Sequence, residues 1–331
     1  MHRRDSMKAL RCLLVALLIL TGRAAHADAV LTLGHAVTPG HPRALAAKYF
    51  AKAVTLKSHG HINIEILGGA SFGDDTAMLK ALQNGSLDIS ANSQGPVSAL
   101  VPDINAFGMP FLFSRPEQAW RLLDGPLGQQ LSTRLSDAGL IALGFWDNGI
   151  RHFSNAVRPL LKPADFSGLI IRTPADPVTT AIVEALGATP VEIRFSGLHK
   201  ALQRRVVDGQ ENPLVNIREA RLNEVQKYIS LTGHRYEITP FVMSRRAWTA
   251  LPPDDREIIR HAAQEATRYQ RELSLQAEAA SYRALSAAGM RIDKVDTAPF
   301  VAATRSIYDT WYASNSGPYV RAVVHEARGH E

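Results

Sequence analysis

The sequence predicts an α/β fold of two domains, in which parallel sheets are covered by helices on both sides. Short strand-like runs of about five residues alternate with amphipathic segments of about ten residues, and the series occurs twice. Residues 254–288 form a third feature, one unbroken helical segment. Such a helix would reach ~50 Å at 1.5 Å per residue, so we expect it to run across both domains.

The first series begins with a strand at residues 30–34, a helix at 42–57 and a strand at 61–66. A helix at 74–83 follows, and its apolar side chains share one face. Residues 86–90 then have the pattern of another strand. This strand, helix, strand order favours parallel pairing.

The second series follows one or two helices at residues 116–135 and a strand at 141–146 that ends in polar residues 147–149. Its elements are expected to be a strand at 169–172, a helix at 178–186, a strand at 190–193 and a helix at 197–205. The long helix begins after Pro252, with Asp254 and Asp255 at its positive end, and stops at Gly289.

The N-terminal segment has the features of an export signal: basic residues, an apolar run from Cys12 to Leu20, and small residues before position 28. We therefore expect export of the chain and cleavage after about Ala27. Segment 1–27 carries +4 of the formal net charge of +6, which leaves +2 on the mature chain. A charge this small gives no electrostatic footprint for nucleic acid. Because Cys12 is the single cysteine, the mature chain has no disulfide or thiolate chemistry.

Enzyme and cofactor motifs are absent from the sequence. There is no Gly-x-Ser-x-Gly elbow, phosphate-binding loop or dinucleotide fingerprint. His325 and His330 lie five residues apart, so they do not share a helix face as zinc ligands would, and we interpret them as part of a solvated tail. We expect no cofactor and no metal.

Arg172 has the strongest functional pattern in the sequence. It ends the apolar strand 169–171, which we expect to be buried on both faces, and it precedes Pro174. Ligands of open α/β sheets bind outside the carboxyl ends of the strands. An arginine there can hold a carboxylate with two parallel hydrogen bonds. The alternative is a structural ion pair with one of three acidic residues: Asp165, Asp176 or Glu211.

Four motifs resemble those of the solute-binding subunits of TRAP (tripartite ATP-independent periplasmic) transporters. They are Leu-Ile-Ile-Arg-Thr-Pro at 169–174, Ala-Leu-Gln at 201–203, Val-Asp-Gly-Gln-Glu-Asn-Pro at 207–213 and Glu-Val-Gln-Lys-Tyr at 224–228. The resemblance implies a periplasmic-binding-protein-like fold, with two α/β domains around a ligand cleft and a hinge. It also implies a periplasmic location and an organic acid as ligand, with small and large membrane subunits of a sodium-driven permease as partners. We expect a monomer.

The resemblance places domain I at residues 28–149 plus 237–277 and domain II at 150–236 plus 278–331. The chain would cross between them near Asn148 and Tyr236. It also implies that Arg172 is the main carboxylate contact, that Arg151 is a second basic contact, and that Asn212 supports the carboxylate.

Further expected contacts rest on the same resemblance. Phe195 corresponds to the aromatic that packs on the ligand's carbon chain, although it could equally be a core residue. Asp74 and Asp75 could accept hydrogen bonds from ligand hydroxyls, and helix capping explains them equally well. Ser93 and Gln94 occupy the region where specificity varies in the family.

Two other interpretations remain open at this stage. An exported isomerase or lyase acting on an organic acid would need a titratable pair in the cleft. A binding protein of an ATP-driven importer or a sensor would share the cleft but lack the joint motifs. Within the site, Arg194, Arg204 and Arg205 could form a second anionic subsite, but we favour a solvated helix face.

Overall fold

The computed structural model describes residues 29–329. The expected export signal at 1–27, including Cys12, lies outside these residues, as does His330. Among the helices of this part of the chain, none is long and apolar enough to cross a membrane.

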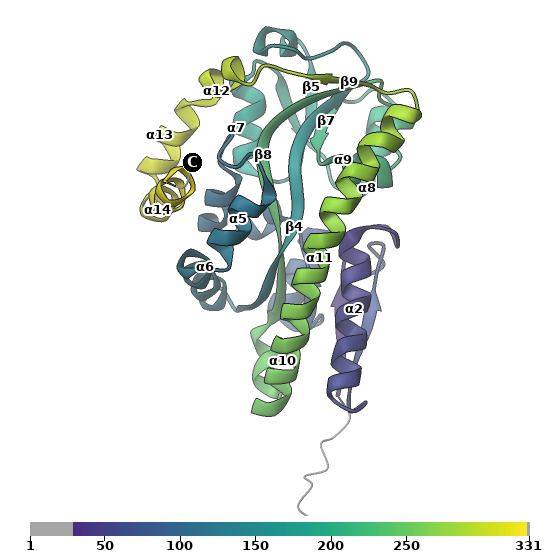
Figure 1. Ribbon diagram of the computed structural model, residues 1–331, viewed down its shortest axis with the longest axis vertical. Coiled ribbons are helices and arrows are strands. Elements are labelled where there is room, and N and C mark those ends of the chain that lie inside the picture. Colours follow the sequence, from purple (N-terminus) through teal and green to yellow (C-terminus); the bar gives the residue numbers. More distant parts are fainter. Residues whose placement is uncertain (1–28, 330–331) are drawn as a thin grey trace, which may run out of the picture.

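One mixed sheet of nine strands organises the molecule (Figure 1). The strand order is β2-β1-β3-β8-β4-β7-β5-β6, and β9 pairs with β8. The strands are β1 (Ala29–Gly34), β2 (Ile62–Leu67), β3 (Ile89–Ala91), β4 (Leu140–Asn155), β5 (Ile170–Thr173), β6 (Thr189–Glu192), β7 (Gly209–Asn212), β8 (Tyr228–Ser244) and β9 (Arg291–Lys294). Their pairing is parallel within each end of the sheet but antiparallel between β3 and β8, β4 and β8, and β4 and β7. The expectation of purely parallel sheets was therefore wrong.

Two long strands, β4 and β8, run the length of the molecule as an antiparallel pair (Figure 1). β3 pairs with the C-terminal end of β8, whereas β9 pairs with its N-terminal end. β7 pairs with β4 only at residues 152–155. The sheet thus has two ends, a first lobe built on β1, β2 and β3 and a second lobe built on β5, β6 and β7, joined by β4 and β8.

The strand expected at residues 141–146 continues to Asn155. Polar residues 147–149 normally end a strand, but here they pair with β8 across a register shift between Asp147 and Gly149. Gly149 has φ +115°, a conformation that side chains with a Cβ rarely adopt. A bulge of this kind bends a strand without ending it.

Helices cover both lobes. Those before the second lobe are α2 (Pro42–Lys57), α3 (Asp75–Asn84), α4 (Gln94–Ser98), η1 (Pro102–Gly108), α5 (Pro116–Leu123) and α6 (Pro126–Asp137). The second lobe contributes η2 (Pro163–Phe166), α7 (Pro177–Ala185), α8 (Phe195–Gln203), α9 (Leu214–Glu219) and η3 (Leu222–Glu224). The C-terminal part adds α10 (Arg245–Ala250), α11 (Pro253–Ala287), α12 (Ala298–Thr304), α13 (Ser306–Ala313) and α14 (Gly317–Arg328).

Helix α11 has 35 residues and packs against α2, β4 and α9, so it contacts both lobes as expected (Figure 1). Pro253 stands at its first position, and Asp254 and Asp255 lie in its first turn. This placement suits the positive end of the helix dipole.

The C-terminal helices correct the interpretation of residues 325–330 as a solvated tail. Residues 317–328 form α14, which buries Val320, Val323 and Val324 against η1 and α5. His325 is exposed on the outer face of this helix. The motif at residues 325–330 contains no information about the apolar face formed by the residues before it. That apolar face holds the helix against the core.

Candidate functional site

A cavity of about 190 Å³ lies where the two lobes face each other beside β4 and β8. The first lobe lines it with Ala36, Val37, Arg43, Ala70, Asp74, Asp75, Thr76, Ser93 and Pro96. The second lobe lines it with Arg172, Pro174, Ala175, Glu192, Ile193, Arg194, Phe195, Ser196, Asn212 and Asn216. Asn148, Arg151 and Glu237 come from the two long strands. Of the residues expected in the site, all but Gln94 line this cavity.

Arg172 lies near the end of β5, and its side chain is buried. Its Nε donates to the backbone carbonyl of Ile193 at 2.7 Å. No carboxylate among residues 29–329 forms an ion pair with it, because each expected partner is committed elsewhere. Asp165 accepts from the amides of Leu161 and Lys162, Asp176 pairs with Arg235, and Glu211 pairs with Arg151.

Burial lowers the pKa of Arg172 to about 10, with Glu211 raising it and the positive charge of Arg151 lowering it further. The guanidinium is therefore still charged at neutral pH. The neighbouring Ile170 is 37% exposed, so the expectation that strand 169–171 is buried on both faces was wrong for this residue. β5 has helix α7 packed against it, but part of Ile170 remains open to solvent.

Arg151 is held by two buried carboxylates. Its Nε and one Nη bond to Glu211 and its other Nη to Glu237, while Asn212 accepts from it at 3.1 Å. Burial alone would lower the pKa of Arg151, but these carboxylates raise it above the ordinary value. Most of its donors are thus already occupied inside the protein.

Glu211 completes this buried network. Burial alone would raise its pKa, but Arg151 and a bond from His234 lower it to about 2. His234 lies 3.3 Å from Glu211, and burial lowers the pKa of its imidazole. The carboxylate is therefore ionised and fixed, and it holds Arg151 at the edge of the cavity.

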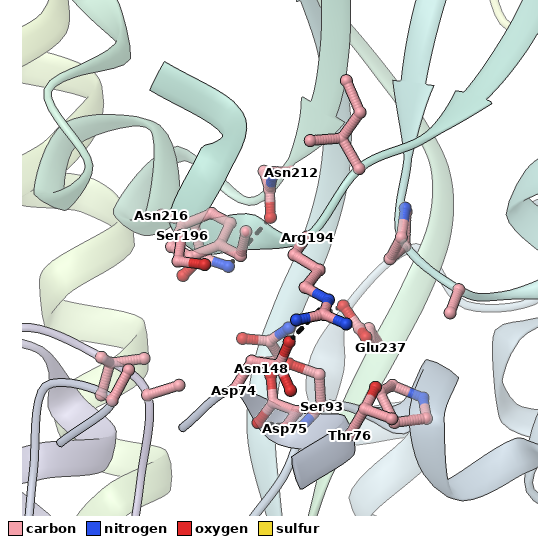
Figure 2. Close-up of a pocket in the computed structure, with 18 of the residues that line it drawn as sticks. Asp74, Asp75, Thr76, Ser93, Asn148, Arg194, Ser196, Asn212, Asn216 and Glu237 are labelled. Carbon is pink, nitrogen blue, oxygen red and sulfur yellow. Dashed lines mark hydrogen bonds and ion pairs between the residues drawn. The ribbon is translucent and has the colours of Figure 1, made fainter. Parts of the chain in front are cut away.

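Asn212 and Asn216 form an amide pair on the second-lobe wall (Figure 2). The Asn216 amide donates to the Asn212 carbonyl at 3.0 Å, and Asn216 also contacts His41 of the first lobe at 2.9 Å. Asn212 donates one of its two N–H groups to Gln210. One donor of the Asn212 amide therefore remains for a bound molecule.

The first-lobe wall is acidic and hydroxylated (Figure 2). Asp74 caps α3 by accepting from Ala77 at 2.9 Å, and it also pairs with Arg194 at 3.1 Å. Asp75 accepts from the Ser93 amide at 3.2 Å and lies 3.7 Å from Arg43. Burial raises the pKa of Asp75, and Arg43 partly opposes this. Asp74 thus both caps α3 and lines the cavity.

Arg43, Glu237 and Asn216 were not anticipated from the sequence. Arg43 lies in the first turn of α2, where its buried guanidinium donates to Thr239 at 2.9 Å and to Asn148 at 3.3 Å. A cation at the positive end of a helix is electrostatically unfavourable. This unfavourable position, visible in the sequence, could have indicated that Arg43 has a role other than stabilising the helix.

Phe195 and Gln94 differ in their placement. Phe195 begins α8, lines the cavity and is partly packed on the core of the second lobe. Gln94 is fully buried, and its Oε1 accepts from the Ile238 amide at 3.2 Å. The structure therefore does not bring Gln94 to the cavity, because its side chain binds β8 instead.

Arg194 is exposed, as are Arg204 and Arg205, but it lies at the opposite end of α8 from them. It reaches across the mouth of the cavity to Asp74 of the first lobe (Figure 2). Thr38 and Glu219 form another bond between the lobes, 2.8 Å long. Gly95 provides a further contact, because an added Cβ would lie 2.7 Å from the carbonyl of Ala175. The lobes thus touch on several sides of the cavity.

Of the four arginines that line the cavity, three pair with carboxylates: Arg43, Arg151 and Arg194. Arg172 is the one without an acidic partner among residues 29–329. The arrangement can hold an anion at one wall and hydroxyl groups at the opposite, acidic wall.

Known proteins resemble this chain over most of its length. Residues 33–315 match the model of the family described as bacterial extracellular solute-binding protein, family 7 (DctP). The uncharacterized protein y4mM of Sinorhizobium fredii is 46% identical over 93% of this chain, which spans 57% of that protein's length. The 2,3-diketo-L-gulonate-binding periplasmic protein YiaO of Escherichia coli is 31% identical over 73% of this chain and 74% of its own.

Solved structures share the fold as well. The sugar acid binding protein DctPAm from Advenella mimigardefordensis, in complex with galactonate, superposes with a TM-score of 0.89 at 28% identity. The match covers 92% of this chain and 99% of that one.

Proposed function

The chain belongs to the bacterial extracellular solute-binding proteins of family 7, of the TRAP class, and from this we propose that it is the extracytoplasmic receptor of a TRAP transporter. In this role it binds an organic acid through its carboxylate and delivers the acid to a sodium-driven permease with a small and a large membrane subunit. Relatives of the chain are binding proteins, and the proposal requires no turnover by the protein itself.

The observation that carries the proposal is the buried guanidinium of Arg172, which lies beside the cavity and forms no ion pair with a carboxylate among residues 29–329. A buried charge without a partner is unfavourable, and a carboxylate bound by the guanidinium fork removes that cost. Asn212 adds one amide donor from the same lobe. Arg151 acts mainly by fixing Glu211 and Glu237, because these carboxylates already occupy most of its donors.

The remaining contacts favour an acid that carries hydroxyl groups. Asp74, Asp75 and Ser93 offer acceptors opposite Arg172, and hydroxyl groups are the donors that match them. Phe195 supplies an apolar surface for the carbon chain. The diketogulonate-binding and galactonate-binding relatives support this class of ligand. We assign Gln94 a supporting role behind the first-lobe residues that line the cavity.

Closure of the cleft follows from the same assignment. We propose that domain I comprises residues 28–149 and 237–277, and that domain II comprises 150–236 and 278–331, with the crossings in β4 and β8. The acid would contact Arg172 on one side and the acidic wall on the other. A ligand that contacts both lobes only when they meet shifts the population toward the closed state.

Reconstitution in liposomes tests the proposal. The purified protein with its cognate membrane subunits should support uptake of the acid only under an inward sodium gradient. Uptake driven by ATP without that gradient would assign the protein to a different transporter class. Steady conversion of the acid by the purified protein alone would make it an exported enzyme.

A further inference from the structure

A second cavity, of about 350 Å³, lies beside the crossing of β4 and is walled by β4, α9 and α11. We call it the hinge pocket, and define it by Asp147, His152, Val215, Leu275, Glu278 and Tyr282. Leu275 and Tyr282 are 39% and 40% exposed, so the pocket is open to solvent on the α11 side. Asn148 lines both this pocket and the first cavity.

Two carboxyl groups of the hinge pocket, Asp147 and Glu278, form no ion pair with any residue from 29 to 329. Asp147 is only 4% exposed, and its Oδ1 has no hydrogen-bond partner among residues 29–329. Glu278 accepts one long bond, 3.4 Å, from the Val215 amide and forms no ion pair within the described part of the chain. Burial raises the pKa of both groups to about 7. At Asp147, hydrogen bonds from Tyr236 and Trp120 and the charge of Arg271 oppose the rise in part. At Glu278, the negative charge of Asp147 adds to the rise.

The nearest cations are already occupied. Arg271 binds Asp124 through two nitrogens, at 2.6 and 2.9 Å, and Arg218 binds Glu219 at 2.6 Å. The pocket histidines are no substitute, because burial lowers the pKa of both His41 and His152 to about 3. Tyr236 also faces Asp147, and burial raises the pKa of its phenol, so it adds no positive charge.

We propose that the hinge pocket binds a small organic ammonium ion, with its charged head at Asp147 and Glu278 and its hydrocarbon tail on Val215, Leu275 and Tyr282. An ammonium group has three donors and no acceptor, which matches a site that offers carboxylate oxygens. The apolar walls favour an alkyl tail over a hydrated metal ion. An ion bound here touches β4, α9 and α11 together, so it also holds the crossing in one geometry.

The probe is n-butylammonium, titrated into the wild-type protein at pH 8 and followed by heteronuclear NMR. We expect saturable shifts at residues 147–152 and 274–282, with neutral n-butanol causing none at equal concentration. Methylammonium should bind more weakly, by roughly fourfold for each methylene that no longer packs. At pH 5.5 the binding should weaken, because both carboxyls then take up protons while the amine stays charged.

Matched variants test the placement of the charge. Glu278→Gln and Asp147→Asn should each weaken butylammonium binding by about tenfold, the loss of one charge-assisted hydrogen bond. Glu272→Gln, an exposed position of the same helix, should have no effect. Equal binding of butanol and butylammonium, or unchanged binding by Glu278→Gln, would overturn the proposal. The alcohol and methylammonium comparisons use the native chain, so they stand even if a variant fails to fold.

Discussion

The Nε of Arg172 donates to the carbonyl of Ile193, at 2.7 Å, which ties the guanidinium to the chain just after β6. One donor of the group is used to fix its orientation, and none is used on a carboxylate of the described chain. The two terminal nitrogens of the fork are therefore available to a ligand in the cavity, and the first prediction follows from that geometry.

Arg172→Ala should lose about 2–5 kcal/mol of binding free energy, the cost of removing one partner of a buried charge pair. Affinity for the acid should fall by roughly thirty-fold to several thousand-fold in calorimetry. Arg172→Lys should also bind poorly, because an ammonium cannot reproduce the fork. The exposed Arg204→Ala is the control and should bind normally. Binding by Arg172→Ala within threefold of wild type would show that the anchor is another residue.

Removal of Arg172 should not unfold the protein. Burial lowers the pKa of Arg172, which means that its charge is unfavourable in the folded state. We expect the melting temperature of Arg172→Ala without ligand to equal or exceed that of the wild type. This measurement separates a loss of binding from a loss of structure.

Glu211→Ala should behave in the opposite way. It leaves Arg151 with one of its two buried carboxylates and removes the bond to His234. Breaking a buried pair costs about 3–5 kcal/mol, so urea unfolding should show a loss of that order. Glu192→Ala, an exposed carboxylate that also lines the cavity, should change stability by less than about 0.5 kcal/mol. Similar stability for the two variants would contradict the importance of the network.

The Arg194 and Asp74 pair should affect ligand release more than protein stability. The pair spans the mouth of the cavity, but the Arg194 side chain is 79% exposed. Exposed pairs contribute about 0.2–1 kcal/mol, so Arg194→Gln should speed dissociation by up to about fivefold in stopped-flow measurements at low salt. Asp74→Asn preserves an N-cap acceptor for α3 and should give the same rate. The double variant should be no faster than either single one, and additive effects would show that the two residues act separately.

Glu278→Gln should change how stability depends on pH. The folded-state pKa of Glu278 is about 7, above its ordinary value of 4.5, so the native protein binds more protons between these values. The stability that Glu278 contributes in the wild type is fully present below pH 4.5 and is lost as the pH rises through 7. The glutamine of Glu278→Gln does not titrate and so does not lose this contribution. The free energy of unfolding of the variant, relative to that of the wild type, should therefore rise between pH 5 and 8, by up to ~1.4 kcal/mol per pH unit. Chemical denaturation at several pH values measures the difference.

The lowered pKa values of His35, His41 and His152 act in the opposite direction in the same pH range. These histidines are present in the wild type and in Glu278→Gln, so their effects on stability cancel when the two proteins are compared. A difference in stability that stays constant from pH 5 to pH 8 would show that Glu278 titrates normally.

Ligand should also make the particle more compact. If the acid draws the two lobes together, small-angle scattering should show a smaller radius of gyration at saturating ligand and the same mass. Arg172→Ala should show no compaction at that ligand concentration. An identical scattering curve for the wild type with and without ligand would argue against closure about β4 and β8.

The first-lobe elements could be predicted from the sequence because their signals are local. The strand and helix periods of residues 30–66 agree with β1, α2 and β2, and Asp74 and Gly85 bound α3 as capping rules require. The extension of β4 through Asp147 could not be predicted in this way. It depends on pairing with β8, which lies about ninety residues later in the chain.

The place of Arg172 beside a cavity could be predicted, because it ends a strand of an α/β sheet. The role of a side chain was less predictable where other protein groups compete with the cavity for its hydrogen bonds. Arg151 seemed free to contact a ligand until the structure placed Glu211 and Glu237 beside it. Gln94 follows Ser93 directly, but at the start of α4 the two side chains diverge, and only that of Ser93 reaches the cavity.

The paired strands β4 and β8 have a mechanical consequence. Two strands joined by a ladder of hydrogen bonds bend out of their plane far more readily than they slide past one another, because sliding breaks the ladder. The register shifts near Gly144, Gly149 and Phe153 concentrate that bending in a short length. If the cleft closes about this connection, we expect the lobes to approach each other along one path, by bending and not by sliding. An acid whose shape requires a sideways offset of the lobes would be rejected even if it satisfied every polar group in the cavity.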